Sequence, residues 1–482
     1  MYLGIDLGTS GVKALLVDDE QAIVTSANAP LNVDRPSSGW SEQNPADWID
    51  ATKKAIGSLR TSHAKQLSAV RGIGLSGQMH GATLLDASGD VLRPCMLWND
   101  TRSFREASEL DSNPEFRSIS GNIVFPGFTA PKVIWVKNNE PDIFEKTSKI
   151  LLPKDYLRYW LTGEFVSEMS DASGTSWLDV ENRRWSHKLL DACQLDIDHM
   201  PDLVEGSAPS GHIRKDLAAE WGMNNDVVIA GGAGDNAASA VGMGTVNAED
   251  AFVSLGTSGV LFAANDAYRP KPESAVHAFC HALPGMWHQM GVILSATDAL
   301  NWYAGLVDKD ASVLTSNLGE ELAPPSGIIF LPYLSGERTP HNDAAIRGGF
   351  MGIDHEANDI TLTRSVLEGV TFALRDNQAA LESAGTRLES ITAVGGGSRS
   401  IYWLKLIATV LGVQIKIPAD GDFGAAFGAA RLGLIAEQNC DWREICKPPA
   451  TDKTINPDSR LADAYEEQWH RYRSFYSNIK GL

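Results

Sequence analysis

Residues 4–13 read Gly4-Ile5-Asp6-Leu7-Gly8-Thr9-Ser10-Gly11-Val12-Lys13, and the same pattern returns at residues 253–260 as Val-Ser-Leu-Gly-Thr-Ser-Gly-Val. Each copy places a Gly-Thr-Ser-Gly turn between two short apolar runs, which predicts a β-hairpin. Backbone N–H groups and hydroxyls at such a tip can hold a phosphate without a basic side chain. Two such hairpins in one chain predict a clamp that holds one polyphosphate from both sides.

The two copies differ at one strand position, where the first has Asp6 and the second has Ser254. A carboxylate beside a phosphate repels it unless a divalent cation lies between them, so Asp6 indicates Mg²⁺. The phosphate-binding residues are then Gly8, Thr9, Ser10, Gly256 and Thr257 at the tips, with Lys13 as a point charge on the terminal phosphate. The alternative is an ordinary hairpin with a solvated lysine, and the duplication favours the phosphate site.

Size and charge narrow the class of protein. A chain of 482 residues is long enough for two or three domains. Its net charge of −20 argues against a nucleic-acid partner or an anionic membrane surface. Five cysteines without a Cys-x-x-Cys pair, a first strand at Tyr2 and no apolar run of about 18 residues predict a cytoplasmic protein with reduced thiols.

Strand-like and helix-like segments alternate along the chain, and glycine-rich turns join them in both halves. Residues 72–77 match Gly-x-Gly-x-x-Gly, but a second strand follows them, so a dinucleotide fingerprint is discounted. The repeated hairpin predicts two related α/β domains, residues 1–245 and 246–482. By analogy this is the actin-like ATPase (ribonuclease H-like) architecture, with the active site in the cleft between the domains.

Asp235 is the candidate catalytic base. It follows an apolar strand and precedes a helix in Gly234-Asp235-Asn236, where α/β proteins often keep catalytic groups. The alternative is a helix N-cap. Three glycines at residues 395–397 would let a ribose or a base lie against the backbone, and residues 421–424 are a weaker companion.

Two polar clusters with aromatic or thioether neighbours suit a polyol. They are Gln78-Met79-His80 and a run from Trp98 to Arg102 that includes Asp100. A lone histidine is more often structural, and this alternative stays open for His80. The pair His277 and His281 has no second ligand pair at structural-zinc spacing, so a zinc site is discounted.

These motifs resemble those of the FGGY carbohydrate kinases, over residues 1 to about 434. The matching pieces are residues 6–13, 76–83, 97–102, 128–132, 152–156, 234–236, 255–259, 334–340 and 395–397. Residues 127–139 fit the family's first signature. The second, at residues 349–368, fits less closely, because Thr361 stands where the family usually has an acidic or amide residue.

The resemblance is greatest to family members that act on D-xylulose, and it implies transfer of a phosphoryl group from ATP, with Mg²⁺, to the sugar 5-hydroxyl. Matched by motif, Asp235 is the base and Asp6 organises the metal and phosphates. The implied sugar contacts are Met79, His80, Asp235 and Asn236, and Gly396 and Gly397 lie near adenosine. The open alternatives are another family substrate (ribulose, gluconate or glycerol) and an actin-like ATPase switch. The expected partners are the sugar and ATP, and a homodimer stays open as the assembly.

Overall fold

Within residues 1–419 and 423–481, which the computed structural model describes, two seven-stranded sheets organise the chain. The first has the order β13 (Pro209–His212), β14 (Val228–Ala230), β5 (Gly72–Gly77), β1 (Tyr2–Leu7), β2 (Gly11–Val17) and β3 (Ile23–Pro30), with β15 (Ala233–Gly234) also beside β5. The second has the order β18 (His277–Cys280), β19 (Trp287–Ile293), β17 (Gly259–Asn265), β16 (Ala251–Leu255), β22 (Ser390–Val394), β23 (Gln414–Pro418) and β24 (Thr451–Ile455).

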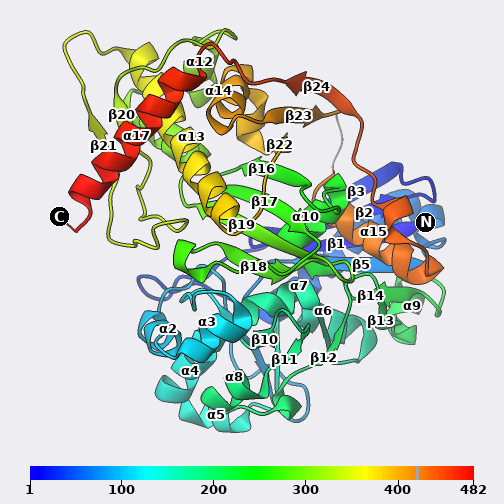
Figure 1. The fold of residues 1–482 in the computed structure, drawn as a ribbon. Helices are drawn as coiled ribbons and strands as arrows, with labels where there is room; N and C mark the ends of the chain where they lie inside the picture. The colour runs from blue at the N-terminus through cyan, green and yellow to red at the C-terminus, as the bar shows by residue number, and fades with distance from the viewer. Residues whose placement is uncertain (420–422, 482) are drawn as a thin grey trace.

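The two sheets repeat one pairing scheme around the two hairpins. In the first, β1 pairs antiparallel with β2 and parallel with β5. In the second, β16 pairs antiparallel with β17 and parallel with β22. The predicted hairpins and the predicted pair of related α/β units are confirmed. Figure 1 shows the two sheets meeting at the middle of the molecule.

The strands of the first sheet alternate between two covered faces. On one face, Leu3, Ile5 and Leu7 pack with three helices, α1 (Pro45–Leu67), α6 (Pro153–Thr162) and α9 (Lys215–Trp221). The helix α1 begins after Asn44, whose side chain accepts a hydrogen bond from the Ala46 N–H group.

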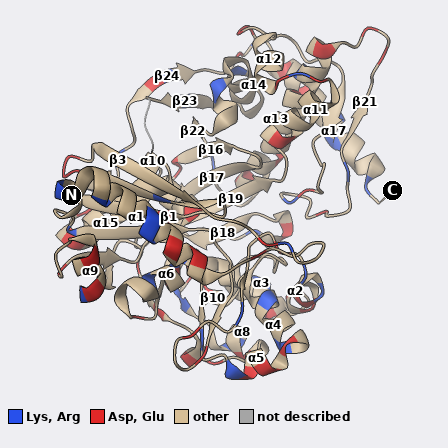
Figure 2. Cartoon of the chain, turned by 180° about the vertical axis from the view of Figure 1, so that it is seen from behind, with Lys and Arg blue, Asp and Glu red and all other residues tan. Residues whose placement is uncertain are grey.

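The other face is covered by α15 (Ala425–Gln438), a helix from late in the chain, and Figure 2 shows α15 beside the first sheet from behind. The contact is backbone to backbone: a Cβ on Gly4 would lie 1.8 Å from the Ala426 carbonyl oxygen, and one on Gly74 would lie 1.7 Å from that of Ala429. Only glycine permits this approach. The division into domains at residue 245 stays a prediction. The helix α15 belongs to the second half of the chain but packs against the sheet of the first half.

The second sheet also has two different faces. One packs against α11 (Thr297–Leu306), α13 (Asp359–Ser383), α14 (Ile401–Leu411) and α17 (Ala462–Ile479). The other carries Phe252, Phe262 and Met290, which join a buried cluster with Met79 and Phe128 of the first half. Ser254 alternates with Val253 and therefore lies on this second face, toward the first half.

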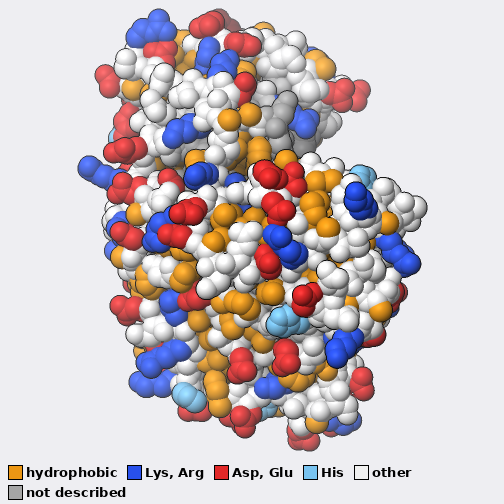
Figure 3. Space-filling view, turned by 90° about the vertical axis from the view of Figure 1, so that its right-hand side faces the viewer, with side chains coloured by type: hydrophobic (Ala, Val, Ile, Leu, Met, Phe, Trp, Pro, Cys, Tyr) orange, Lys and Arg blue, Asp and Glu red, His pale blue; other side chains and the backbone are white. Residues whose placement is uncertain are grey.

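A helical region between β5 and β14 forms the lower part of Figure 1. It includes α2 (Phe104–Asp111), α4 (Thr129–Asn139), α7 (Met169–Ala172) and α8 (His187–Ala192). On the face shown in Figure 3, acidic and basic side chains are interspersed. In the described residues, the longest apolar helical stretches fall short of what a bilayer crossing requires.

Candidate active site

A cavity of about 300 Å³ lies where the two halves meet. This volume is at the lower end of the range for pockets that bind small molecules. Predicted site residues that line it are Met79, His80, Trp98, Asp235, Asn236 and Gly256, together with Ser254 and Ser258 of the second hairpin. Five of the predicted sugar residues and the second hairpin therefore meet at one cavity.

Strand pairing brings Asp235 toward the first hairpin. In the parallel register, Asp6 of β1 lies opposite Ser76 of β5, and Ser76 lies opposite Ala233 of β15. Asp235 follows two residues later and begins α10 (Asp235–Met243). The carboxyl ends of these strands therefore place both carboxylates at the same edge of the sheet.

Asp235 has one hydrogen-bonded oxygen and one that is open. Its Oδ1 accepts from the Asn236 backbone N–H at 2.7 Å and from Asn236 Nδ2 at 3.0 Å, whereas no described residue donates to Oδ2. The N-cap of α10 is Gly234, so capping does not use the Asp235 carboxylate. Burial, and secondly the charge of Asp6, raise the pKa of Asp235 to about 6. A carboxylate with this pKa is still ionised at neutral pH and is more basic than usual.

Asp6 is partly buried at the end of β1, next to the cavity rather than in its lining. Ser76 Oγ donates to Asp6 Oδ1 at 2.5 Å, and Lys13 lies opposite Asp6 across the hairpin. Burial raises the pKa of Asp6, while Ser76 and Lys13 oppose this shift. No described residue donates to Asp6 Oδ2.

The first hairpin tip is tied to two of the predicted sugar residues. Thr9 Oγ1 donates to Gln78 Oε1 at 3.0 Å and accepts from Trp98 Nε1 at 3.0 Å. The Gly8 N–H donates to the Gly11 carbonyl oxygen, which closes the turn, and Ser10 is exposed at its tip. Trp98 remains 44% exposed and lines the cavity.

The second tip is tied to the start of α11. The carbonyl oxygens of Gly256 and Thr257 accept from the backbone N–H groups of Thr297 and Ala296, at 2.9 and 2.8 Å. The glycine turn follows β22, and Gly395 and Gly397 are so close to Leu255 of the hairpin that a Cβ on either would clash with it. Gly396 is exposed, with open space where a Cβ would be. Residues 421 and 422 of the weaker companion loop lie outside the described residues.

His80 is held as a neutral imidazole. Its Nδ1 lies 2.8 Å from the Gly174 carbonyl oxygen, so Nδ1 carries the proton and Nε2 is left as an acceptor. Burial lowers the pKa of His80 to about 3. Its ring stacks on Phe128 at 4.5 Å, and Lys132 Nζ donates to the His80 carbonyl oxygen at 2.9 Å. The imidazole is thus positioned to accept a hydrogen bond from a ligand.

Three other predicted sugar residues lie outside the cavity lining. Gln78 Nε2 donates to Gln43 Oε1 at 2.9 Å. Asp100 and Arg102 form a buried ion pair at 2.6 Å, and the Arg102 guanidinium also contacts Glu42 at 2.8 Å. These side chains are engaged with protein groups, and this arrangement gives no support to the direct sugar contact expected for them.

The structure adds cavity residues that were not assigned to the site from the sequence: Phe125, Gly127, Phe128, Val260, His277, Phe279, Met290, Val292 and Arg338. His277 is stacked on Phe279, with ring centroids 5.3 Å apart. The sequence could have placed His277 and Phe279 together, since they lie two residues apart in the strand β18 and such residues share one face of a strand.

A buried charge cluster supports the loop before Asp235. Lys154 Nζ lies within 3.3 Å of three carboxylates, those of Asp155, Glu168 and Asp171. Glu168 accepts from Ser170 Oγ at 2.8 Å, and Ser170 Oγ accepts from the Gly234 N–H at 3.1 Å. The cluster therefore fixes the backbone next to Asp235.

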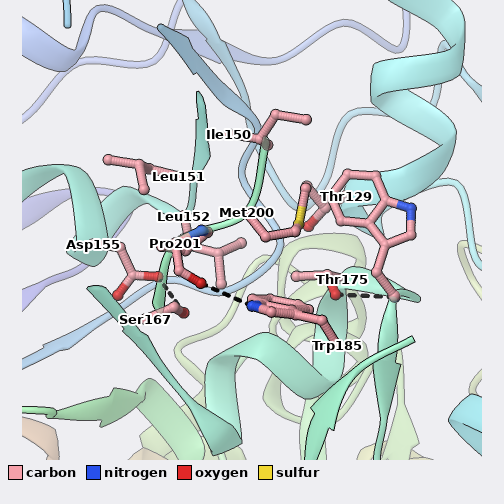
Figure 4. Close-up of a pocket in the computed structure, with 11 residues that line it drawn as sticks. Thr129, Ile150, Leu151, Leu152, Asp155, Ser167, Thr175, Trp185, Met200 and Pro201 are labelled. Atoms are coloured by element: carbon pink, nitrogen blue, oxygen red, sulfur yellow. Dashed lines mark hydrogen bonds between the residues drawn. The ribbon is translucent and has the colours of Figure 1, made fainter. Parts of the chain in front are cut away.

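A second cavity, shown in Figure 4, lies beside this cluster. There Asp155 accepts from Ser167 Oγ at 2.6 Å, and Trp185 Nε1 donates to the Pro201 carbonyl oxygen at 2.8 Å. Its volume of about 10 Å³ is no more than the space of a single water molecule. This cavity is therefore too small for a sugar.

Comparison with known proteins gives the same assignment for both halves. Residues 1–242 match the N-terminal domain, and residues 251–437 the C-terminal domain, of the FGGY family of carbohydrate kinases. The chain is 47% identical to a xylulose kinase of Escherichia coli strain K12, over 100% of both chains.

Two solved structures cover nearly the whole chain. A structure described as a xyloylose kinase from Brucella ovis has a TM-score of 0.98 and 64% identity, over 99% of both chains. A Plasmodium falciparum glycerol kinase with ADP has a TM-score of 0.90 at 19% identity, over 100% of this chain and 98% of that one, and supports the fold alone. The expected two-domain, actin-like fold is confirmed. The chain belongs to the FGGY family of carbohydrate kinases and is an ATP-dependent carbohydrate kinase.

Proposed function

We propose that this kinase transfers the terminal phosphoryl group of ATP to the 5-hydroxyl of D-xylulose. The observation that carries the proposal is Asp235, whose Oδ2 is open to a cavity that the second hairpin also lines. The xylulose kinase name of the relatives supports the choice of sugar. In the reaction, Asp235 accepts the proton of the attacking hydroxyl as it bonds to phosphorus and ADP leaves.

The sugar would be held mainly from the first half. His80 Nε2 accepts a hydrogen bond from a sugar hydroxyl, Asn236 offers its amide, and Met79 supplies apolar surface. The phosphates would lie between the tips, against Gly8, Thr9, Ser10, Gly256 and Thr257, with Lys13 on the terminal phosphate. Gly396 and Gly397 would contact adenosine. Alignment and charge stabilisation are what phosphoryl transfer requires.

Mg²⁺ fits this arrangement. Asp6 Oδ2 receives no hydrogen bond from the described residues, and Asp6 and Asp235 place two negative charges beside the phosphate cradle. Mg²⁺ is usually held by one or two carboxylates, waters and substrate phosphates. Asp6 would hold the ion, which when bound neutralises phosphate charge.

The test is sugar-dependent ADP release by the purified protein, measured in a coupled assay with D-xylulose, D-ribulose, gluconate, glycerol and no acceptor. We expect turnover to be highest with D-xylulose and to be at background without a sugar. Preference for another polyol would assign a different substrate within the family. Equal ADP release with and without acceptor would overturn the kinase proposal in favour of an ATPase switch.

A further inference from the structure

The cavity contains a cation that the proposed chemistry does not use. Arg338 lies in the segment between β20 (Ile329–Leu331) and β21 (Gly349–Met351) and lines the cavity. Within residues 1–419 and 423–481 its guanidinium has no hydrogen bond and no ion pair, and its contact is with the face of Phe125, at 4.9 Å from the ring centroid. Five N–H donors are thus left for a ligand, and an unpaired cation in a cavity costs free energy until acceptors reach it.

The backbone that carries Arg338 is fixed on the second sheet. Glu337 Oε1 accepts from the Leu294 N–H at 3.1 Å, and the Thr339 N–H donates to the Val292 carbonyl oxygen at 3.1 Å. Thr339 Oγ1 accepts from the Val292 N–H at 3.1 Å. Both neighbours of Arg338 are therefore anchored at the end of β19, so the guanidinium is held toward the cavity by a preorganised loop.

The nearest acidic side chain does not neutralise Arg338. Glu337 Oε1 is occupied by the N–H groups of Leu294 and Arg338, and Oε2 has no partner among the described residues. Burial raises the pKa of Glu337 to about 8, so this carboxyl is largely protonated at neutral pH. The positive charge of Arg338 therefore acts on the cavity.

Arg338 and Asp235 line the same cavity from different halves of the chain. Arg338 is close enough to His80 and His277 to contribute to the lowered pKa of both imidazoles. The charge that acts on Asp235 is instead that of Asp6. A ligand that spans the cavity with its reacting hydroxyl at Asp235 would present its opposite end to Arg338.

The chemistry of D-xylulose, the substrate of the proposed function on which this step rests, identifies the end of the ligand that would face Arg338. A 2-ketopentose closes its five-membered ring by adding O5 to C2, so only the open-chain form has a free 5-hydroxyl. That form has a hydroxyl oxygen and a carbonyl oxygen, O1 and O2, on adjacent carbons at the far end. A guanidinium presents parallel N–H donors, which suit two neighbouring acceptors.

We propose that Arg338 binds O1 and O2 of the open-chain sugar and is a specificity-determining residue of the pocket. Because His80 and Asp235 come from the first half and Arg338 from the second, the sugar then bridges the two halves. Recognition of the hydroxyketone selects the ring-opened ketose and disfavours polyols, which lack the carbonyl oxygen.

The test compares wild type, Arg338→Met and Arg338→Lys, with Arg347→Met as the matched control. Arg347 is an exposed arginine of the same segment, and among the described residues its guanidinium bonds only to nearby carbonyl oxygens. KM and kcat are measured for ATP, D-xylulose and 1-deoxy-D-xylulose, which lacks O1, and the Kd of D-xylulose is measured by calorimetry without ATP. Circular dichroism and thermal unfolding show that each variant is folded.

We expect Arg338→Met to raise the KM and Kd of D-xylulose about 10- to 100-fold, with the KM of ATP unchanged. The rise in KM on this substitution should be several-fold smaller for 1-deoxy-D-xylulose, because that sugar already lacks one of the two acceptor oxygens. Arg338→Lys should recover part of the affinity, and Arg347→Met should behave as wild type.

Two results separate this inference from the proposed function. If wild type does not phosphorylate D-xylulose, the proposed function fails. The inference is overturned, and the proposed function stands, if wild type phosphorylates D-xylulose and Arg338→Met keeps the KM of D-xylulose within about twofold of wild type. An equal rise in KM for D-xylulose and for 1-deoxy-D-xylulose would overturn the inference in the same way.

Discussion

The two hairpins share a strand register but differ in chemistry. In the first, Asp6 has Lys13 opposite it on one neighbouring strand and Ser76 on the other. At the same places in the second, Ser254 has Val260 and Val394. Under the proposed function the duplicated hairpin supplies two phosphate cradles, and the charged groups at these positions belong only to the copy that lies beside Asp235. The two hairpins share a backbone arrangement but differ in charge, and in the proposed reaction this difference would place the metal and the terminal phosphate on the Asp6 side.

The largest effect is expected when the proposed base beside the first hairpin is removed. Asp235→Asn keeps the shape of the side chain but cannot accept the hydroxyl proton, so we expect kcat to fall by about 10³-fold or more, with ATP affinity retained. The same change should raise the free energy of unfolding at pH 8. Folding raises the pKa of this carboxyl from 3.8 to about 6, so stability is lost as the pH rises between these values and the full penalty is present above about pH 6. Activity within tenfold of wild type would show that Asp235 is not the base.

The next test makes the two hairpins alike. Asp6→Ser copies the second hairpin into the first, and we expect kcat/KM for ATP to fall about 10²-fold, with more Mg²⁺ needed for half-maximal rate. Adding Ser254→Asp should not restore activity, because the second copy has no lysine and no hydroxyl beside that position. The measurement is a titration of Mg²⁺ at fixed ATP. Rescue by the double change would mean that the hairpins are interchangeable.

The pH profile tests the coupling between the two carboxylates. Below about pH 6, kcat/KM should fall about tenfold per unit, because the base must be ionised and burial and Asp6 raise its pKa. In Asp6→Asn the negative charge is removed, so the acidic limb should move to lower pH even though the rate is reduced. An acidic limb at the same pH in both proteins would show that Asp6 does not act on Asp235.

The smallest expected effect concerns the hydroxyl beside Asp6. Ser76→Ala removes the donor to Asp6 Oδ1, so the pKa of Asp6 should rise further and kcat/KM for ATP should fall about 2- to 10-fold. Val394→Ala is the control at the same place in the second sheet. It should change thermal stability without changing the Mg²⁺ dependence. Equal effects of the two substitutions on that dependence would count against a special role for Ser76.

Local patterns predicted the hairpins and Asp235 at the end of a strand. These features depend on residues that are close together in the chain, so the sequence alone is enough to predict them. Asp100 and Arg102 show the limit of such reasoning, because a polar pair in a ligand site and a buried ion pair have the same composition. Arg338 could not be placed from the sequence, since its direction depends on how residues 337 and 339 bond to β19, far away in the chain.

The packing of α15 has a consequence for the synthesis of the protein. The face of the first sheet that carries Tyr2, Leu15 and Val17 is covered by residues 426–434, which are translated long after it. Until they leave the ribosome, the nascent first half has an uncovered apolar surface, so it cannot finish folding before the second half has been made. A chain that stops before Ala425 would therefore expose this apolar face and would not be an independently folded half-enzyme.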